Sequence, residues 1–182
     1  MRFILNNVRV AFPVIWTPEP FPDGKDPTPY FSLTGIMAPD HPQLPELRKA
    51  IESCAQEKFG TNWKAVLAAA ERLGKVCLRD GDLKPDLEGY PGNFTISMRG
   101  KVRPTIVGKN KEILVEADGK PYSGCYVNLI FDLFAYTTSA KGVAAGLKGV
   151  QFRADGDAFS GSAPASVDDF ENMADTGDDL AG

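Results

Sequence analysis

Five positively charged residues near the middle of the chain could bind a polyanion. The stretch 99–111 has no acidic residue and contains Arg99, Lys101, Arg103, Lys109 and Lys111. Alternate side chains of a strand share a face, so the first three cations would lie together, provided that Gly100 introduces no bulge. Lys and Arg on such a face can neutralise phosphates. The alternative is a solvated outer face that contacts no ligand.

Aromatic residues in the segment 122–136 could supply a second kind of contact. From Cys125 onward its odd-numbered positions are apolar, whereas its even-numbered positions mix aromatic and polar residues. Aromatic rings stack on unpaired bases for ~1–3 kcal/mol per base, while neighbouring cations follow the phosphates. We therefore predict that Tyr122 and Tyr126 stack on bases, together with Tyr30 on the outer positions of another strand. Ile130 and Phe134 are expected instead to pack against helices.

Most enzymatic functions lack the residues that they would need. The single histidine, His41, stands before Pro42, and a catalytic triad would depend on it alone. The glycines of 141–150 do not match a phosphate-binding loop, and no pair of cysteines has C-x-x-C spacing. We predict no catalytic residue, no cofactor and no metal site.

One acidic loop leaves a nuclease open as an alternative. The loop carries Asp80, Asp82, Asp86 and Glu88. It begins like a calcium-binding loop but places Lys84 and Pro85 where that motif requires an acidic or amide side chain and a glycine. Four carboxylates could still hold Mg²⁺ for hydrolysis of nucleic acid, although a solvated loop is the default expectation.

A β-rich framework must position these side chains. Alternating residues predict strands at 8–14, 30–37 and 94–98, an extended segment at 103–107, and strands at 113–116, 122–136 and 150–152. An apolar stripe predicts a helix at 46–59, ended by Gly60, and a second helix follows from about 63 to 73. The order favours a compact, mainly β, antiparallel five-stranded barrel with a helical insertion at about 44–73.

The composition is that of an ordinary globular domain with no signal for export. Hydrophobic residues make up 43% of the 182, and no apolar run approaches the ~18 residues of a spanning helix. The first residues lack the features of a secretory signal. Cys54, Cys77 and Cys125 are odd in number and widely spaced, which indicates free thiols in a reducing cytoplasm.

Charge is distributed unevenly along the chain. Residues 160–182 contain six acidic residues and no Lys or Arg, a net charge of −6. Residues 1–159 carry 20 Lys and Arg against 18 Asp and Glu, a net charge of +2, so the sum is −4. We predict a domain at 1–159 and a disordered acidic tail at 160–182. The tail residues expected to bind a partner are Asp168, Asp169, Phe170, Glu171, Asp178 and Asp179. A tail that only aids solubility is the alternative.

Four segments of the sequence resemble a family of bacteriophage proteins. They read NNVRVAFPVIW, GKVRPTIVG, SGCYVNLIFDLFAY and KGVAAGLKGVQFRADGDAFSG. The resemblance implies an OB-fold, binding of single-stranded DNA without catalysis, and a role in replication, recombination or repair of phage DNA. It also implies binding roles for Lys101 and Arg103, and for Tyr122 and Tyr126.

The resemblance further implies where the protein acts and what it meets there. The expected location is the cytoplasm of the infected bacterium. The expected partners are single-stranded DNA and, through the tail, phage or host replication and recombination proteins. Besides the nuclease, the remaining alternative is a phage structural or interaction protein that uses its β-face for protein contacts.

Overall fold

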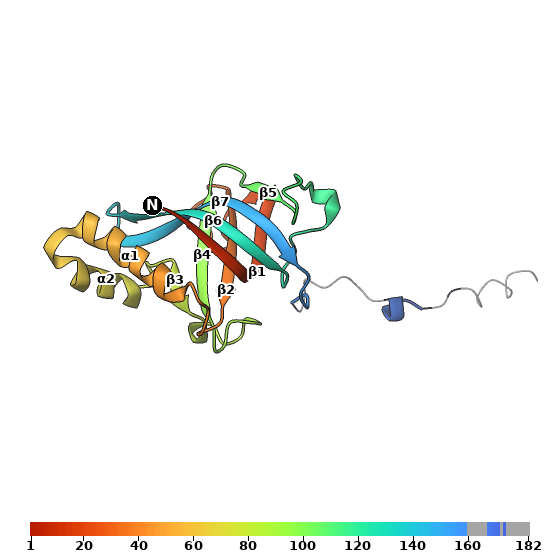
Figure 1. Ribbon diagram of the computed structural model, residues 1–182, viewed down its shortest axis with the longest axis horizontal. Helices are drawn as coiled ribbons and strands as arrows, with labels where there is room; N and C mark the ends of the chain where they lie inside the picture. The colour runs from red at the N-terminus through yellow and green to blue at the C-terminus, as the bar shows by residue number, and fades with distance from the viewer. Residues whose placement is uncertain (160–166, 172, 174–182) are drawn as a thin grey trace, which may run out of the picture.

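The fold is a closed β-barrel with a helical insertion, as the computed structural model of residues 1–159, 167–171 and 173 shows (Figure 1). The strands of the barrel are β1 (Arg2–Glu19), β2 (Tyr30–Met37), β4 (Phe94–Gly100), β6 (Tyr126–Tyr136) and β7 (Gly142–Ala154). Two short strands extend its edges: β3 (Leu78–Asp80) pairs with β4, and β5 (Thr105–Val107) pairs with β7. The predicted five-stranded barrel is confirmed.

The strands follow one another around the barrel in the order β4-β2-β1-β6-β7, and β7 closes onto β4. The four pairs within this order are antiparallel. The closing pair, β4 with β7, is parallel, with Arg99 opposite Gly146. A closed ring with an odd number of strands cannot alternate direction throughout, so one parallel pair is required.

Alternation of side chains builds the core of the barrel. The odd-numbered residues of β6 point inward, and Val127, Leu129 and Phe131 are fully buried, as the sequence predicted. Gly35 of β2 leaves room for them, because a Cβ at that position would lie 3.1 Å from Cδ1 of Leu129. Side chains of neighbouring strands therefore pack directly against the backbone of β2 at this position.

The helical insertion lies between β2 and β3 and packs at one end of the barrel (Figure 1). It comprises α1 (Leu44–Phe59), a short turn η1 (Gly60–Asn62) and α2 (Trp63–Arg72). Leu47, Ile51 and Cys54 form the buried stripe of α1 and join the barrel core. Gly60 has φ = 66°, which ends α1 as predicted. No helix in the described part of the chain is long and apolar enough to cross a membrane.

Several predicted strand boundaries are wrong. β4 ends at Gly100, and Lys101 to Pro104 form a bend, so the cationic row does not continue as a strand. Residues 113–116 make one bridge, between Ile113 and Val107, before the short helix η3 (Glu116–Asp118). Tyr122 precedes β6 instead of starting it, because the chain turns at 122–125. Another short helix, η2 (Gly81–Leu83), follows β3.

The prediction that helices cover Ile130 and Phe134 is also wrong. These side chains are 36% and 49% exposed and point outward from β6. The apolar stripe of the helices packs instead against inward-pointing side chains of the barrel.

The domain boundary predicted at 159 coincides with a buried anchor. Phe159 packs with Ala11, Ile36 and Tyr90 in a second small core on the outside of β1 and β2. Beyond it the structure describes the short helix η4 (Val167–Asp169) and a few neighbours. Asp178, Asp179 and the side chain of Asp169 lie outside the described residues. The predicted disorder of the tail stays a prediction.

Candidate nucleic-acid interface

The outer face of β2 and β4 is lined by small polar side chains. Phe31 and Leu33 of β2 point into the barrel, so Tyr30, Ser32 and Thr34 point outward. On β4, Arg99 lies opposite Ser32, and Ser97 lies opposite Thr34. Thr34 is buried, whereas Ser32 and Ser97 are half-buried, so these two serines form a floor of small side chains over which an extended ligand could lie.

At one end of this floor lies a group of residues that we call the Arg99 cluster: Phe21, Tyr30 and Arg99. The guanidinium carbon of Arg99 is 4.7 Å from the ring centroid of Tyr30 and 5.5 Å from that of Phe21. The two rings stack, with centroids 5.6 Å apart and planes inclined by 26°. The structure thus brings together Arg99 and Tyr30, which the sequence analysis proposed separately, and it adds Phe21. A position in a proline-rich loop concealed Phe21, because strand periodicity does not extend to loops.

Hydrogen bonds hold the Arg99 cluster in place. The hydroxyl of Tyr30 donates to Oδ2 of Asp26 over 3.2 Å. The pKa of Asp26 lies below its usual value, mainly because Thr28 donates hydrogen bonds to its carboxylate, with smaller effects from Tyr30 and Arg99. An ionised Asp26 orients the ring of Tyr30 and leaves Arg99 in contact with the rings of Tyr30 and Phe21.

Lys101 and Arg103 follow the cluster at the same end of the barrel. Lys101 is exposed on the bend after β4. Arg103 donates to the carbonyl of Trp16 over 2.8 Å, and its guanidinium carbon is 6.0 Å from the ring centroid of Phe31. Both side chains are accessible, but Arg103 also has a structural contact.

Lys109 and Lys111 lie farther away, on the turn after β5. The Nζ atom of Lys109 is 6.0 Å from the ring centroid of Phe152, and that of Lys120, which sequence reasoning missed, is 4.8 Å away. Phe152 stands six residues along β7 from Gly146, the partner of Arg99, a separation of about 20 Å. The five predicted cations therefore form a line rather than a single patch.

Tyr122 and Tyr126 do not join the Arg99 cluster. The hydroxyl of Tyr122 donates to Oδ1 of Asp155 over 2.8 Å and accepts from the amide of Gly156 over 3.2 Å, so it fastens the segment before the tail. Burial raises the pKa of Tyr122. The ring of Tyr126 lies against Gly156.

The strand register sets the distance between these tyrosines and the cluster. Tyr126 pairs with Arg9, and Arg9 pairs with Ile36. Ile36 is six residues along β2 from Tyr30, or about 20 Å. Their predicted stacking role would need a ligand that crosses the barrel.

Phe12, beside β2 on the outer face of the barrel, is an exposed aromatic residue that the sequence analysis did not propose for binding. The sequence pattern placed it with the buried residues Val8 and Val10, but its side chain is 55% exposed. Consecutive pairs of β1 with β2 are Ala11 with Thr34 and then Val14 with Ser32, so β1 carries one extra residue there. That bulge turns Phe12 outward. Pro13 was the signal of irregular pairing available in the sequence.

The acidic loop is organised by backbone hydrogen bonds. Oδ1 of Asp80 accepts from the amide of Asp82 over 2.9 Å, and Oδ1 of Asp82 accepts from the amide of Gly92 over 2.7 Å. Among the residues that the structure describes, no group of three or more His, Cys, Asp or Glu side chains could hold a metal ion. The ring of His41 lies between the carbonyl of Asn6 and the amide of Gln43. This geometry gives the nuclease alternative no support.

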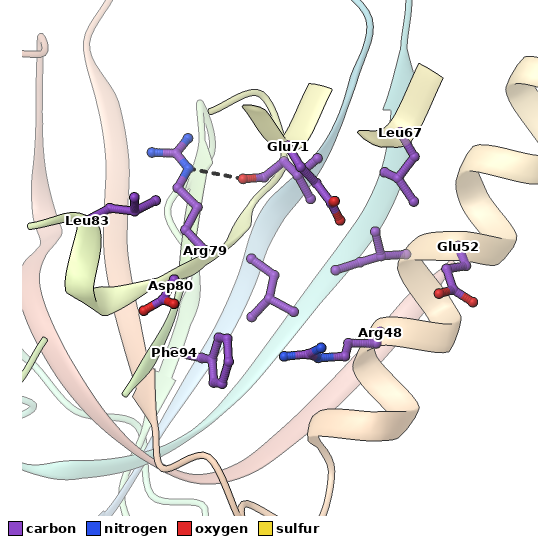
Figure 2. A pocket seen from close by; sticks show the side chains of 11 residues that line it. Arg48, Glu52, Leu67, Glu71, Arg79, Asp80, Leu83 and Phe94 are labelled. Carbon is purple, nitrogen blue, oxygen red and sulfur yellow. Dashed lines mark hydrogen bonds between the residues drawn. The ribbon is translucent and has the colours of Figure 1, made fainter. Parts of the chain in front are cut away.

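A cleft of about 350 Å³ lies between the helices and β3, at the end of β4 away from Arg99 (Figure 2). Figure 2 shows Arg48 from α1 and Arg79 from β3 on opposite sides of it, with Glu52 and Glu71 nearby. Arg79 donates to the carbonyls of Val76 and Gly74, and Arg48 lies 4.8 Å from the ring centroid of Phe94. The cleft carries both acidic and basic side chains, and its arginines contact other parts of the protein. It is therefore a poor site for a polyanion.

Comparison with known proteins agrees with the β-barrel and the motifs. Residues 1–180 match the model of a family described as the single-stranded-DNA-binding protein of Enterobacter phage Enc34. Protein p50 of Acyrthosiphon pisum secondary endosymbiont phage 1 is 38% identical over 176 residues, which cover 96% of this chain and 95% of that protein.

Solved structures share the fold. The single-stranded-DNA-binding protein of bacteriophage Enc34, in complex with single-stranded DNA, has a TM-score of 0.71 at 24% identity, over 87% of this chain and 89% of that one. The single-stranded-DNA-binding protein gp2.5 of bacteriophage T7 has a TM-score of 0.59 at 11% identity, over 91% and 98% of the two chains.

The family is described by binding of single-stranded DNA, which agrees with the prediction of a non-catalytic protein. The match across nearly the whole chain and the 38% identity to a phage protein leave one assignment: the chain belongs to the phage family of Enc34-type single-stranded-DNA-binding proteins.

Proposed function

We propose that this protein binds single-stranded DNA without sequence preference, along the outer face of β2 and β4. The observation that carries the proposal is the Arg99 cluster, in which a guanidinium lies over two stacked rings beside a floor of small residues. Such a group can contact a phosphate and a base together. Membership of the Enc34 family supports it.

The strand follows the line of cations from the Arg99 cluster. Arg99, Lys101 and Arg103 contact phosphates at one end, and Lys109 and Lys111 continue the track toward the end of the barrel near Phe152. Tyr30 stacks on a base, and Tyr122 and Tyr126 meet a longer ligand on the other side of β1. If all five cations met phosphates, log K would fall with log salt with a slope near roughly −3.5, from about −0.7 per phosphate.

The acidic tail shields this surface and recruits partner proteins in replication, recombination or repair, in the cytoplasm of the infected bacterium. Phe159 anchors the start of the tail beside Ile36, on the same strand as Tyr30 and about 20 Å from it. A flexible chain of 23 residues spans roughly 25 Å, which reaches the cluster. The body of +2 and the tail of −6 attract each other.

Fluorescence anisotropy tests the proposal with a labelled oligo-dT of about 30 nucleotides, a duplex of equal length, two salt concentrations and EDTA. We expect tight, salt-sensitive binding to the single strand and weaker binding to the duplex. Arg99→Ala should weaken binding, whereas Lys49→Ala, on the exposed side of α1, should not. Absence of binding at low salt would overturn the proposal and direct attention to the exposed apolar residues Ile4, Ile130 and Phe134 as a protein-binding face.

A further inference from the structure

Phe12 is an exposed aromatic residue held in an unusual backbone conformation. Its φ is 50°, in the left-handed region that bulky residues rarely adopt. It stands at the bulge between Ala11 and Val14, and more than half of its side chain faces solvent. Residues held in sparsely populated conformations cluster at functional sites, where the surrounding structure imposes them. Burial of the ring does not account for this conformation, which makes Phe12 a candidate for a functional role.

A rigid neighbour supports the ring of Phe12. The ring meets that of Tyr90 edge-to-face, with centroids 6.4 Å apart and an interplanar angle of 67°. Tyr90 is only 5% exposed and packs with Ala11, Ile36 and Phe159. A hydrogen bond with Thr34 links Tyr90 to β2. The support is thus part of the second core, and Phe12 projects from it as a fixed platform.

The bulge places Phe12 beside the floor of small residues. Phe12 projects from β1 between two levels of the sheet. One level holds the pair Thr34 and Ser97, and the next holds the pair Ser32 and Arg99. Tyr30 is two residues beyond Ser32, so the Cα atoms of Phe12 and Tyr30 are roughly 10 Å apart. Between these two aromatic positions the outer face of β2 carries only Ser32, because Thr34 lies on the far side of Phe12 and is 8% exposed. A short length of single strand can lie across that floor and meet an aromatic ring at each side.

We infer that Phe12 is a second base-stacking platform, which works with Tyr30 and holds an unpaired base against the outer face of β1. The inference rests on the proposed function, since it names a further contact of the same surface. Stacking is tolerant of sequence because every base has a π-face. The contact adds affinity without adding a phosphate contact.

The substitution Phe12→Gly separates function from structure. Glycine adopts φ = 50° without strain, which offsets the lost ring contact with Tyr90, so the melting temperature should stay about the same. Affinity for oligo-dT should fall by about 5-fold or more, as loss of one stacked base implies. The slope of log K against log salt should not change, because no phosphate contact is lost. Phe12→Leu should lose affinity as Phe12→Gly does, and Phe12→Tyr should retain it.

A control comes from the helical insertion, away from Arg99. Leu73 is 72% exposed at the end of α2, so Leu73→Ala removes an accessible apolar side chain, and oligo-dT affinity should be unchanged. If wild type binds oligo-dT and Phe12→Gly binds equally well, the stacking inference is overturned while the proposed function stands. If Phe12→Leu binds as wild type does, the contact is apolar and not a stack, which also overturns it. If wild type does not bind, both proposals fail.

Discussion

At the scale of single residues, the cations of the outer face differ in what else they contact. Arg99 lies over two rings, and Arg103 donates to a backbone carbonyl, so removing either changes more than a charge. Lys101 is exposed on a bend and offers the cleanest test of a phosphate contact.

Lys101→Ala should weaken binding of every single-stranded sequence alike and reduce the salt slope by about 0.7, the value for one phosphate. Adding Arg103→Ala should bring the reduction to about 1.4. Anisotropy titrations of oligo-dT and a mixed-sequence strand at several salt concentrations measure both effects. The control Lys49→Ala should leave the slope unchanged. A double variant with the wild-type slope would remove both residues from the interface.

Buried thiols give the stability a defined dependence on pH. Burial raises the pKa of Cys77 to about 12 and that of Cys125 to about 11. The unfolded chain releases these protons at a pH near 9, so it binds fewer protons than the folded chain above that pH. The free energy of unfolding should therefore fall as pH rises from about 9 toward 11.

Urea denaturation at pH 8, 9 and 10 measures this fall. The variant Cys77→Ala should show a shallower dependence, because one of the two thiols no longer contributes. A dependence identical to that of wild type would mean that other groups cause it.

At the scale of elements, the helical insertion serves the barrel more than the binding face. α1 inserts Leu47 and Ile51 into the core, and its exposed side faces away. Leu47→Ala should lower the free energy of unfolding by about 2–5 kcal/mol through loss of burial and a cavity. Chemical denaturation measures the change, and oligo-dT affinity of the folded variant should be retained. Lys49→Ala on the same helix should change stability by less than about 0.5 kcal/mol. A loss of affinity in folded Leu47→Ala would instead give the insertion a part in binding.

Elements with a clean local pattern could be predicted from the sequence, and irregular ones could not. The strands at 30–37 and 126–136 and the two helices follow from periodicity, because one side of each is buried. The bulge at Phe12 depends on register with β2, and the end of β4 depends on the bend after Gly100. Tyr122 binds a segment 33 residues away, which no local pattern encodes. The candidate site could therefore be predicted as residue types but not as an arrangement: the contact of Arg99 with Tyr30 and the neighbouring positions of Phe12 and Phe21 come from the structure.

At the scale of the whole molecule, the proposed shielding of the outer face by the tail rests on the opposite charges of body and tail. Deleting 160–182 changes the net charge from −4 to +2. The deletion should tighten oligo-dT binding, and the effect should be largest at low salt. At physiological ionic strength, attraction between the tail and the cations is screened beyond about 8 Å, so the tail already competes less with DNA. Parallel titrations of the full chain and the deletion variant at low and physiological salt measure the difference. Unchanged or weaker affinity in the deletion variant would leave the tail to partner binding or solubility.

The pairing of β1 with β6 has a consequence for how the protein is made. Arg2 pairs with Asp132, 130 residues later, so the barrel cannot close on the ribosome until most of the chain has emerged. At about 5–20 residues per second, β1 waits on the order of 10 s for its partner strand. Contacts this distant in sequence also make folding slow. Stopped-flow refolding should therefore take milliseconds to seconds, and a microsecond phase that buries the whole core would contradict this expectation. Meanwhile β2 and β4, which carry Tyr30 and Arg99, are synthesised before the strands that complete the barrel, so their edges stay unpaired with β6 and β7 during that interval.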